Sequence, residues 1–264
     1  MAASEMQYPS VPIARSELRC IRSSIVGQDY QVKIWLPDSY ATTANLYPVL
    51  YLLDGDHAFA MATDIVQYLI YDSHIPEMVI ASPAYGSKVL FADGGTNMRS
   101  RDLPPFPTQH TKMQPGGPAY LEFLEHEFIP FVESNYRTVP TDRTLWGYSF
   151  GSYFGLFALF QKPWLFHRYI LVDGIDERHF GIEEEYAAHH TELPVRLFLS
   201  GCPREDGPEM SRFLDVLGKR NYSGLQAEYV DLNNIGHFAV GAEGLVKGLV
   251  SVFHEQPESL KADG

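Results

Sequence analysis

The sequence predicts a single α/β domain over residues 1–264, with a mostly parallel central sheet, helices on both of its faces and an antiparallel N-terminal edge. Strand-like and helix-like segments alternate along the chain, and no internal repeat or linker interrupts them. The central strand-like segments are apolar almost throughout, whereas the first two alternate polar and apolar residues. With 264 residues, of which 45% are hydrophobic, the chain can build one large core.

The strand-like segments define the sheet. Residues 17–25 and 29–36 alternate polar and apolar side chains around a turn at Gly27, as in a hairpin at a sheet edge. The segment "YPVLYLLDG" (47–55) is nearly all apolar and ends in glycine, which is typical of a parallel strand covered on both faces. The same pattern recurs in "EMVIASP", "RYILVDG" and "PVRLFLSG".

Helical periodicity separates these strands. Residues 119–135 place one apolar stripe on Leu121, Leu124, Phe128 and Val132, and residues 243–254 place another on Leu245, Leu249 and Phe253. Parallel strands need crossover connections, and right-handed connections through helices supply them. We therefore expect helices on both faces of the sheet.

Two segments fit neither pattern and follow predicted parallel strands. Residues 84–118 are rich in Gly and Pro, and residues 174–193 are acidic. Ligands of open α/β sheets bind at the carboxyl ends of the strands, and long irregular segments of a compact domain are usually functional. We expect both segments to line a pocket, with ordinary surface loops as the alternative.

Composition narrows the range of partners. The 33 acidic and 20 basic residues give a formal charge of -13, which disfavours nucleic acid and anionic membrane surfaces. No apolar stretch approaches the roughly 18 residues that a membrane span needs. The first residues show no secretory signal, so we expect a cytoplasmic location; a secreted protein whose signal had been removed would show the same N-terminal pattern. Two distant cysteines argue against a metal site, and no cofactor is expected.

The chemistry-bearing motif is "GYSFG". Gly147, Ser149 and Gly151 fit the pattern G-x-S-x-G between the strand-like "RTLWG" and the helix-like "SYFGLFALF". In this setting the serine occupies a strained strand-to-helix turn, and the two glycines remove side chains that would collide there. The motif predicts Ser149 as a nucleophile; a glycine-rich turn that packs a helix on a strand is the alternative.

A serine nucleophile needs a histidine base, which in the α/β-hydrolase fold follows the acid in the chain. His237 and His254 follow the predicted acid loop. His254 falls in an amphipathic helical pattern, whereas His237 lies in "VDLNNIGHF", directly after a strand. We therefore predict His237 as the base.

The acid must hold the tautomer of the imidazole and stabilise the imidazolium. The segment "SGCPREDGPEM" follows a predicted strand, and Glu205 is preferred within it. The chain order leaves four alternatives open: Asp206, Glu209, Asp173 and Asp176.

Acyl transfer also requires donors for the developing oxyanion. The backbone N–H of Phe150 follows the nucleophile, and the N–H of Asp56 lies in the loop after "YLLDG". His57 precedes Ser149 in the chain, so we expect it to have a structural or substrate-contacting role.

Five segments together resemble the putative esterase family of α/β-hydrolases, which includes siderophore esterases and esterase D-like enzymes. They are "YPVLYLLDG", "NMRSRDL" (97–103), "FLEHEFIPFVESNYRT", "RTLWGYSFGSYFGLFALF" and "IGHF". The resemblance spans about residues 17–255. It implies Ser149 as nucleophile, His237 as base and a carboxylate at the position of Glu205. Where siderophore esterases commonly carry a serine-proline-serine and tryptophan-rich segment, this chain has "VDGIDERHF", so its pocket is expected to differ.

Further residues are predicted to contact substrate. Arg99 and Arg101 resemble the family's arginine-aspartate motif, although an Arg101–Asp102 bridge is an equal alternative. Aromatic residues in these segments suit an aryl or bulky acyl group. They are Tyr85, Phe91, Phe106, Tyr148, Phe150 and Phe180.

These observations predict a serine esterase that hydrolyses a small-molecule ester through an acyl-enzyme. A lactonase or thioesterase that uses the same residues is the alternative, as is a hydrolase-fold protein that only binds a ligand. The expected partner is then a small-molecule ester or lactone, with neither nucleic acid nor membrane, and a homo-oligomer is a further candidate.

Overall fold

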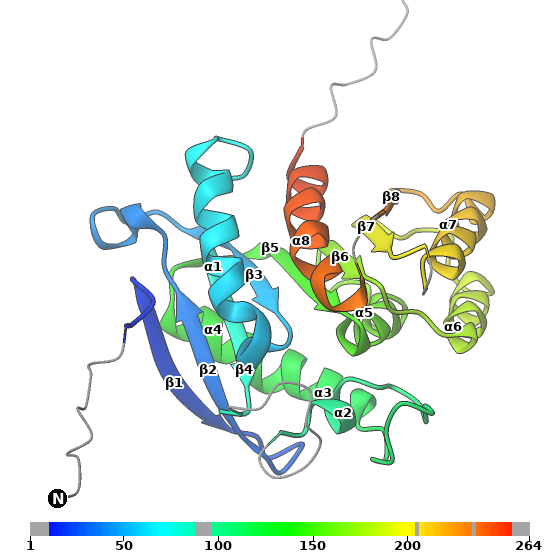
Figure 1. Ribbon diagram of the computed structural model, residues 1–264, viewed down its shortest axis with the longest axis horizontal. Helices are drawn as coiled ribbons and strands as arrows, with labels where there is room; N and C mark the ends of the chain where they lie inside the picture. Colours follow the sequence, from blue (N-terminus) through cyan, green and yellow to red (C-terminus); the bar gives the residue numbers. More distant parts are fainter. Residues whose placement is uncertain (1–10, 88–96, 204–205, 234–235, 255–264) are drawn as a thin grey trace, which may run out of the picture.

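The computed structural model describes residues 11–87, 97–203, 206–233 and 236–254. Within these residues the strands form one eight-stranded sheet in the order β1-β2-β4-β3-β5-β6-β7-β8 (Figure 1). This order, with its non-sequential neighbours β4 and β3, is the α/β-hydrolase fold that the sequence predicts.

The N-terminal edge of the sheet is antiparallel, as predicted. Strands β1 (Ser16–Arg22) and β2 (Asp29–Trp35) form a hairpin in which Gly27 adopts a φ of +71°, a conformation that favours glycine. Strand β2 then pairs antiparallel with β4 (Val79–Ala84).

From β4 onward all neighbouring strands are parallel. They are β3 (Tyr47–Leu52), β5 (Thr138–Tyr148), β6 (Arg168–Val172), β7 (Arg196–Gly201) and β8 (Gln226–Asp231). Strands β3, β4 and β6 are buried nearly throughout because helices cover both of their faces, which explains their continuous apolar runs. Strand β8 lies at the edge and is largely exposed.

Helices α1 (Gly55–Tyr71) and α8 (His237–Phe253) pack together on one face (Figure 1). The other face carries α3 (Gly117–Phe123), η2 (Leu124–Phe128), α4 (Ile129–Asn135), α5 (Phe150–Gln161), α6 (Glu177–Ala187) and α7 (Gly207–Arg220). The predicted helix over 119–135 is therefore present, as α3 and α4 joined by the π-helical turn η2. Short helices η1 (Asp38–Ala41) and α2 (Arg99–Asp102) lie in connections.

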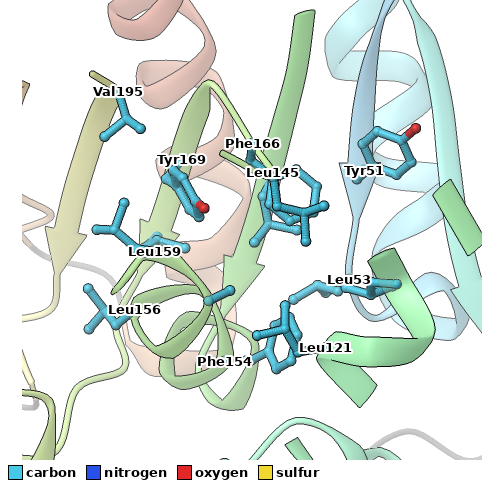
Figure 2. Packing of buried hydrophobic residues seen from close by; sticks show 14 of the residues in the cluster. Tyr51, Leu53, Leu121, Leu145, Phe154, Leu156, Leu159, Phe166, Tyr169 and Val195 are labelled. Carbon is cyan, nitrogen blue, oxygen red and sulfur yellow. The ribbon is translucent and has the colours of Figure 1, made fainter. Parts of the chain in front are cut away.

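Each face has its own hydrophobic core. Figure 2 shows part of the larger one, in which Leu145 and Tyr169 of the sheet point toward Phe154 and Leu159 of α5. Gly155 lets α5 approach the sheet, since a Cβ there would lie 2.2 Å from a methyl group of Leu171. Among the described residues, no helix is long and apolar enough to cross a membrane.

The predicted irregular segments contain more regular structure than expected. Residues 174–193 include α6, in which the buried position 183 carries a glutamate, so the sequence shows no clear apolar periodicity there. The carboxylate of Glu183 accepts hydrogen bonds from Arg220 and Tyr222, which compensates for burial of the charge. Residues 84–118 contain α2, and residues 88–96 lie outside the described part of the chain.

A buried histidine anchors the start of α6. His179 is fully buried; its Nδ1 accepts a hydrogen bond from the backbone N–H of Asp176, and its Nε2–H donates to the carbonyl of Tyr153 on α5. Burial lowers the pKa of His179 from its ordinary value to about 4. The imidazole is therefore neutral at pH 7.

We predict that His179 makes the fold sensitive to acid. In the unfolded chain the imidazole of His179 has a pKa of about 6.5, so between pH 6.5 and pH 4 the unfolded chain binds a proton that the folded chain does not. As the pH is lowered through this window, the free energy of unfolding falls by about 1.4 kcal/mol per pH unit. His179→Gln should remove about 2 kcal/mol of the stability difference between pH 7 and pH 5 in urea unfolding. The exposed His74→Gln should leave the pH dependence unchanged, and equal slopes for wild type and His179→Gln would contradict the prediction.

Candidate active site

Ser149 lies at the turn between β5 and α5. Its backbone has φ 56° and ψ −119°, a strained conformation for a residue with a side chain. Strand β5 ends at Tyr148 and α5 begins at Phe150, so the turn consists of Ser149 alone. The serine side chain consequently stands at the carboxyl edge of the sheet, as the motif predicts.

The two glycines of the motif differ in their steric role. A Cβ on Gly147 would lie 2.2 Å from the carbonyl oxygen of Gly151, which no side chain tolerates. A Cβ on Gly151 would meet its nearest atom, an oxygen of Asp54, at 3.6 Å, an ordinary contact. The expectation that both glycines relieve a collision is therefore correct for Gly147 and wrong for Gly151.

Ser149 and His237 lie within hydrogen-bonding distance. The Nε2 of His237 is 3.2 Å from the Oγ of Ser149, and its Nδ1 is 2.6 Å from a carboxylate oxygen of Asp173. His237 is the first residue of α8, where the sequence placed it in a loop after a strand. Tyr148 holds this residue in place, because its hydroxyl donates a 2.5 Å hydrogen bond to the His237 carbonyl.

Asp173 directly follows β6 and its side chain is fully buried. One carboxylate oxygen faces His237, while the other accepts a 2.8 Å hydrogen bond from the backbone N–H of Cys202. Its own N–H donates to Ser200 of β7. The carboxylate is thus fixed by two neighbouring strands and offers its remaining oxygen to the imidazole.

The sequence preferred Glu205 for this position. Glu205 lies outside the described residues, and the Nδ1 of His237 is bonded to Asp173, one of the four alternatives. The other three have different surroundings: Asp176 caps α6 and pairs with Arg178, Glu209 pairs with Arg212 at the surface, and Asp206 lies at the start of α7. Among the described candidates, Asp173 is the carboxylate that lies at the Nδ1 of His237, and the choice of Glu205 stays a prediction.

Arg99 joins the ends of β3 and β5. Its guanidinium forms a bidentate ion pair with Asp54, in which Nη2 lies 2.9 Å from Oδ2, and it also donates to the carbonyl of Tyr148 at 3.2 Å. Both side chains of the pair are almost completely buried. Arg99 thus braces the strand immediately before Ser149.

A pocket of about 500 Å³ opens above Ser149. Its lining comprises Arg99, Ser100, His110, Tyr148, Ser149, Phe150, Tyr153, Asp206, His237 and Phe238. A larger hollow of about 940 Å³ beside β8 and α8 contains none of the residues of the Ser149–His237–Asp173 chain.

The predicted substrate contacts divide between this pocket and the protein interior. Arg99 and Tyr148 line the pocket, whereas Arg101 does not and pairs with the buried Asp102 instead. Of the aromatic residues predicted to contact substrate, Tyr148 and Phe150 line the pocket. Tyr85 packs on Tyr30, Phe106 on His179 and Phe180 on Phe213, and Phe91 lies outside the described residues.

The two predicted oxyanion donors lie at helix starts. Phe150 is the first residue of α5 and lines the pocket. Asp56 lies in the first turn of α1, with its carboxylate turned to the backbone N–H of Tyr85 and to Lys33. His57, next in the chain, has a lowered pKa because burial disfavours its charged form.

Comparison with known proteins assigns the family. Residues 23–178, more than half of the chain, match the family model described as Putative esterase. The chain belongs to the putative esterase family. As a member of this family, with relatives that are named as esterases, it is a carboxylic-ester hydrolase.

The relatives of this putative esterase include enzymes named for siderophores. It is 25% identical over 258 residues to the ferri-bacillibactin esterase BesA of Bacillus subtilis, a match that covers 86% of each chain. It is 30% identical over 166 residues to the siderophore triacetylfusarinine C esterase of Aspergillus fumigatus, covering 61% of this chain and 56% of the relative. An IroE-like serine hydrolase from Shewanella oneidensis has the same fold, with a TM-score of 0.78 at 24% identity over 90% of this chain and 80% of the other.

The glycines of the turn should respond differently to alanine. Gly147→Ala drives a methyl group into a backbone carbonyl, and we expect it to destabilise the esterase by about 3 kcal/mol or to prevent folding. Gly151→Ala, within α5, should leave stability equal or raise it by up to about 1 kcal/mol. Urea unfolding of the two variants measures this difference, and a larger loss for Gly151→Ala would contradict it.

We expect the loss of one partner of the buried Arg99–Asp54 pair to destabilise the fold more than the loss of both. Arg99→Met leaves the buried Asp54 carboxylate without its ion-pair partner and should cost about 3–5 kcal/mol in urea unfolding. The double variant Asp54→Asn/Arg99→Met should recover most of that loss, because no buried charge remains. Lys247→Met, which breaks an exposed pair with Glu243, serves as a control that changes stability little. Equal losses in the single and double variants would refute the role of the buried charge.

Proposed function

We propose that the protein hydrolyses small-molecule carboxylic esters through an acyl-enzyme on Ser149. One observation carries the proposal: the hydrogen-bonded chain from Ser149 Oγ through His237 to Asp173. A serine hydroxyl becomes a nucleophile when a base removes its proton, and a buried carboxylate behind the imidazole makes the histidine a suitable base.

In this mechanism His237 Nε2 accepts the proton of Ser149 as Oγ attacks the ester carbonyl. Asp173 accepts the hydrogen bond from Nδ1–H, which fixes the tautomer and stabilises the imidazolium. When the tetrahedral intermediate collapses, the imidazolium returns the proton to the departing alkoxide. Water then attacks the acyl-enzyme, with His237 again as the base, and releases the acid.

Stabilisation of the oxyanion falls to the N–H groups of Phe150 and Asp56. Both belong to first turns of helices, where the N–H groups have no carbonyl partner within the helix and the helix dipole is positive. Their parent strands β3 and β5 are adjacent and parallel, so the two helix starts lie at the same edge of the sheet. This arrangement supports a two-donor oxyanion hole.

The pocket supports an ester with an aryl or bulky group. The volume of about 500 Å³ accommodates a ligand of drug-like size. Much of the lining is aromatic and consists of Tyr148, Phe150, Tyr153 and Phe238. The esters of ferri-bacillibactin and triacetylfusarinine C, for which two relatives are named, belong in the first substrate panel. Aryl esters and lactones of smaller size complete it.

Substitution of the three residues should stop the chemistry. We expect Ser149→Ala and His237→Ala to lose the single covalent adduct that a fluorophosphonate probe forms with the wild type, as measured by intact-protein mass spectrometry. Asp173→Asn should fold normally, while its kcat on an aryl ester falls by about 10⁴, the effect of the equivalent change in a serine protease.

Glu205→Gln, compared with Asp173→Asn, tests which carboxylate acts on His237. It should retain kcat within about tenfold, because Asp173 occupies the Nδ1 of His237. A large loss in Glu205→Gln together with an active Asp173→Asn would return the role to Glu205. Full ester hydrolysis by Ser149→Ala would refute the acyl-enzyme mechanism.

A further inference from the structure

Lys33, a largely buried lysine on the antiparallel part of the sheet, contacts the first residues of α1. The Nζ of Lys33, on β2, donates a 3.0 Å hydrogen bond to the carbonyl oxygen of Gly55 and lies 3.4 Å from a carboxylate oxygen of Asp56. Lys33 does not line the pocket, and its side chain is only 25% exposed. The ammonium therefore contacts the peptide that joins Gly55 to Asp56.

This peptide carries one of the two proposed oxyanion donors. A trans peptide is planar, and its carbonyl and its N–H point in opposite directions. When Lys33 holds the Gly55 carbonyl, the N–H of Asp56 is fixed on the opposite side of the same plane. A cation on the carbonyl also polarises the peptide and makes its N–H a stronger donor.

The surroundings leave this peptide little freedom to rotate. A Cβ on Gly55 would lie 2.5 Å from Ser82 Oγ and 2.8 Å from the Pro83 carbonyl, so β4 presses directly against Gly55. The other oxygen of the Asp56 carboxylate accepts a 2.8 Å hydrogen bond from the N–H of Tyr85, just beyond β4. Strands β2 and β4 therefore clamp the first turn of α1 from the side opposite β5.

The clamped turn is close to the nucleophile. Strand β3 pairs with β5 through Leu52 and Trp146, and the next residues along each strand lead to Asp54 and Ser149. An oxygen of Asp54 lies 3.6 Å from the position of a Cβ on Gly151, in the first turn of α5. The first turns of α1 and α5 are thus neighbours at the carboxyl edge.

We infer that Lys33 is a positioning residue of the oxyanion hole: its ammonium orients and polarises the Gly55–Asp56 peptide, so that the Asp56 N–H stabilises the tetrahedral intermediate. The inference rests on the proposed function. Lys33 touches neither the substrate nor the reacting atoms, and its effect passes through the peptide that it holds.

The test compares a transition-state mimic with a ground-state mimic. An aryl boronic acid forms a tetrahedral anion on an active-site serine, whereas the ether analogue of the ester fills the pocket without forming an oxyanion. Lys33→Met, which removes the ammonium but keeps the length of the chain, should lower kcat by about 10- to 100-fold, less than the 10²–10³ lost when an oxyanion donor itself is removed. KM and the affinity for the ether should stay within about threefold, while the boronic acid loses affinity in step with kcat.

Control variants separate positioning from folding. Lys33→Arg, which keeps a charged donor, should restore most of kcat, and Lys247→Met on the exposed face of α8 should leave it unchanged. If Lys33→Met does not fold, Lys33→Gln supplies a neutral donor for the same comparison. An unchanged kcat in folded Lys33→Met, or in Lys33→Gln where that variant takes its place, would overturn the inference, as would an equal loss of affinity for the boronic acid and the ether. Retained hydrolysis in Ser149→Ala would instead refute the proposed function, so the two failures are distinguishable.

Discussion

The parallel alignment of β3, β5, β6 and β7 is the constraint on which the site depends. Parallel strands end at one edge of a sheet, and the important residues follow those ends directly: Asp54 is two residues beyond β3, and Ser149 and Asp173 are each one residue beyond their strands. Adjacent strands are about 4.8 Å apart, so side chains that are distant in the sequence come within hydrogen-bonding distance without long loops. The same alignment places the starts of α1 and α5 beside Ser149, which explains why two helices rather than two loops offer N–H groups there.

Two buried carboxylates at this edge are compensated by neighbouring groups. Asp54 is matched by Arg99, and Asp173 accepts hydrogen bonds from a backbone N–H and from the imidazole. A buried carboxylate without such partners would cost the fold several kcal/mol, so each of these contacts also stabilises the edge. The two carboxylates consequently do different work: Asp54 holds Arg99, which contacts the backbone just before Ser149, and Asp173 contacts His237.

The sequence predicted what depends on local pattern. The buried strands, the hairpin at Gly27, the strained turn at Ser149 and its neighbour His237 follow from periodicity and from a motif with a steric reason. The acid could not be predicted in the same way, because five carboxylates satisfy the required chain order. Three-dimensional distance separates them: β6 is the neighbour of β5, so Asp173 and Asp176 follow the strand next to that of Ser149, whereas the segment after β7 starts two strands away. Asp176 caps α6 and pairs with Arg178, and Asp173 is the one that contacts His237. For Arg101 the sequence left a substrate contact and a bridge to Asp102 open, and the structure shows the bridge.

The pocket is built from residues of the packed core and from exposed residues outside it. Tyr148 ends a strand and Phe150 begins a helix, both of which are packed in the core, so the fold sets the position of Ser149 between them. His110 and Phe238 are exposed, and His110 comes from the connection that precedes α3. Exchanging such connections alters the walls of a pocket at little cost to the core, because few buried contacts depend on them. Sequence changes in these connections can therefore reshape the pocket while the sheet is kept. The segment "VDGIDERHF", which starts α6 with a buried histidine, contributes none of the residues that line this pocket, so its part is in the packing of α6 on α5.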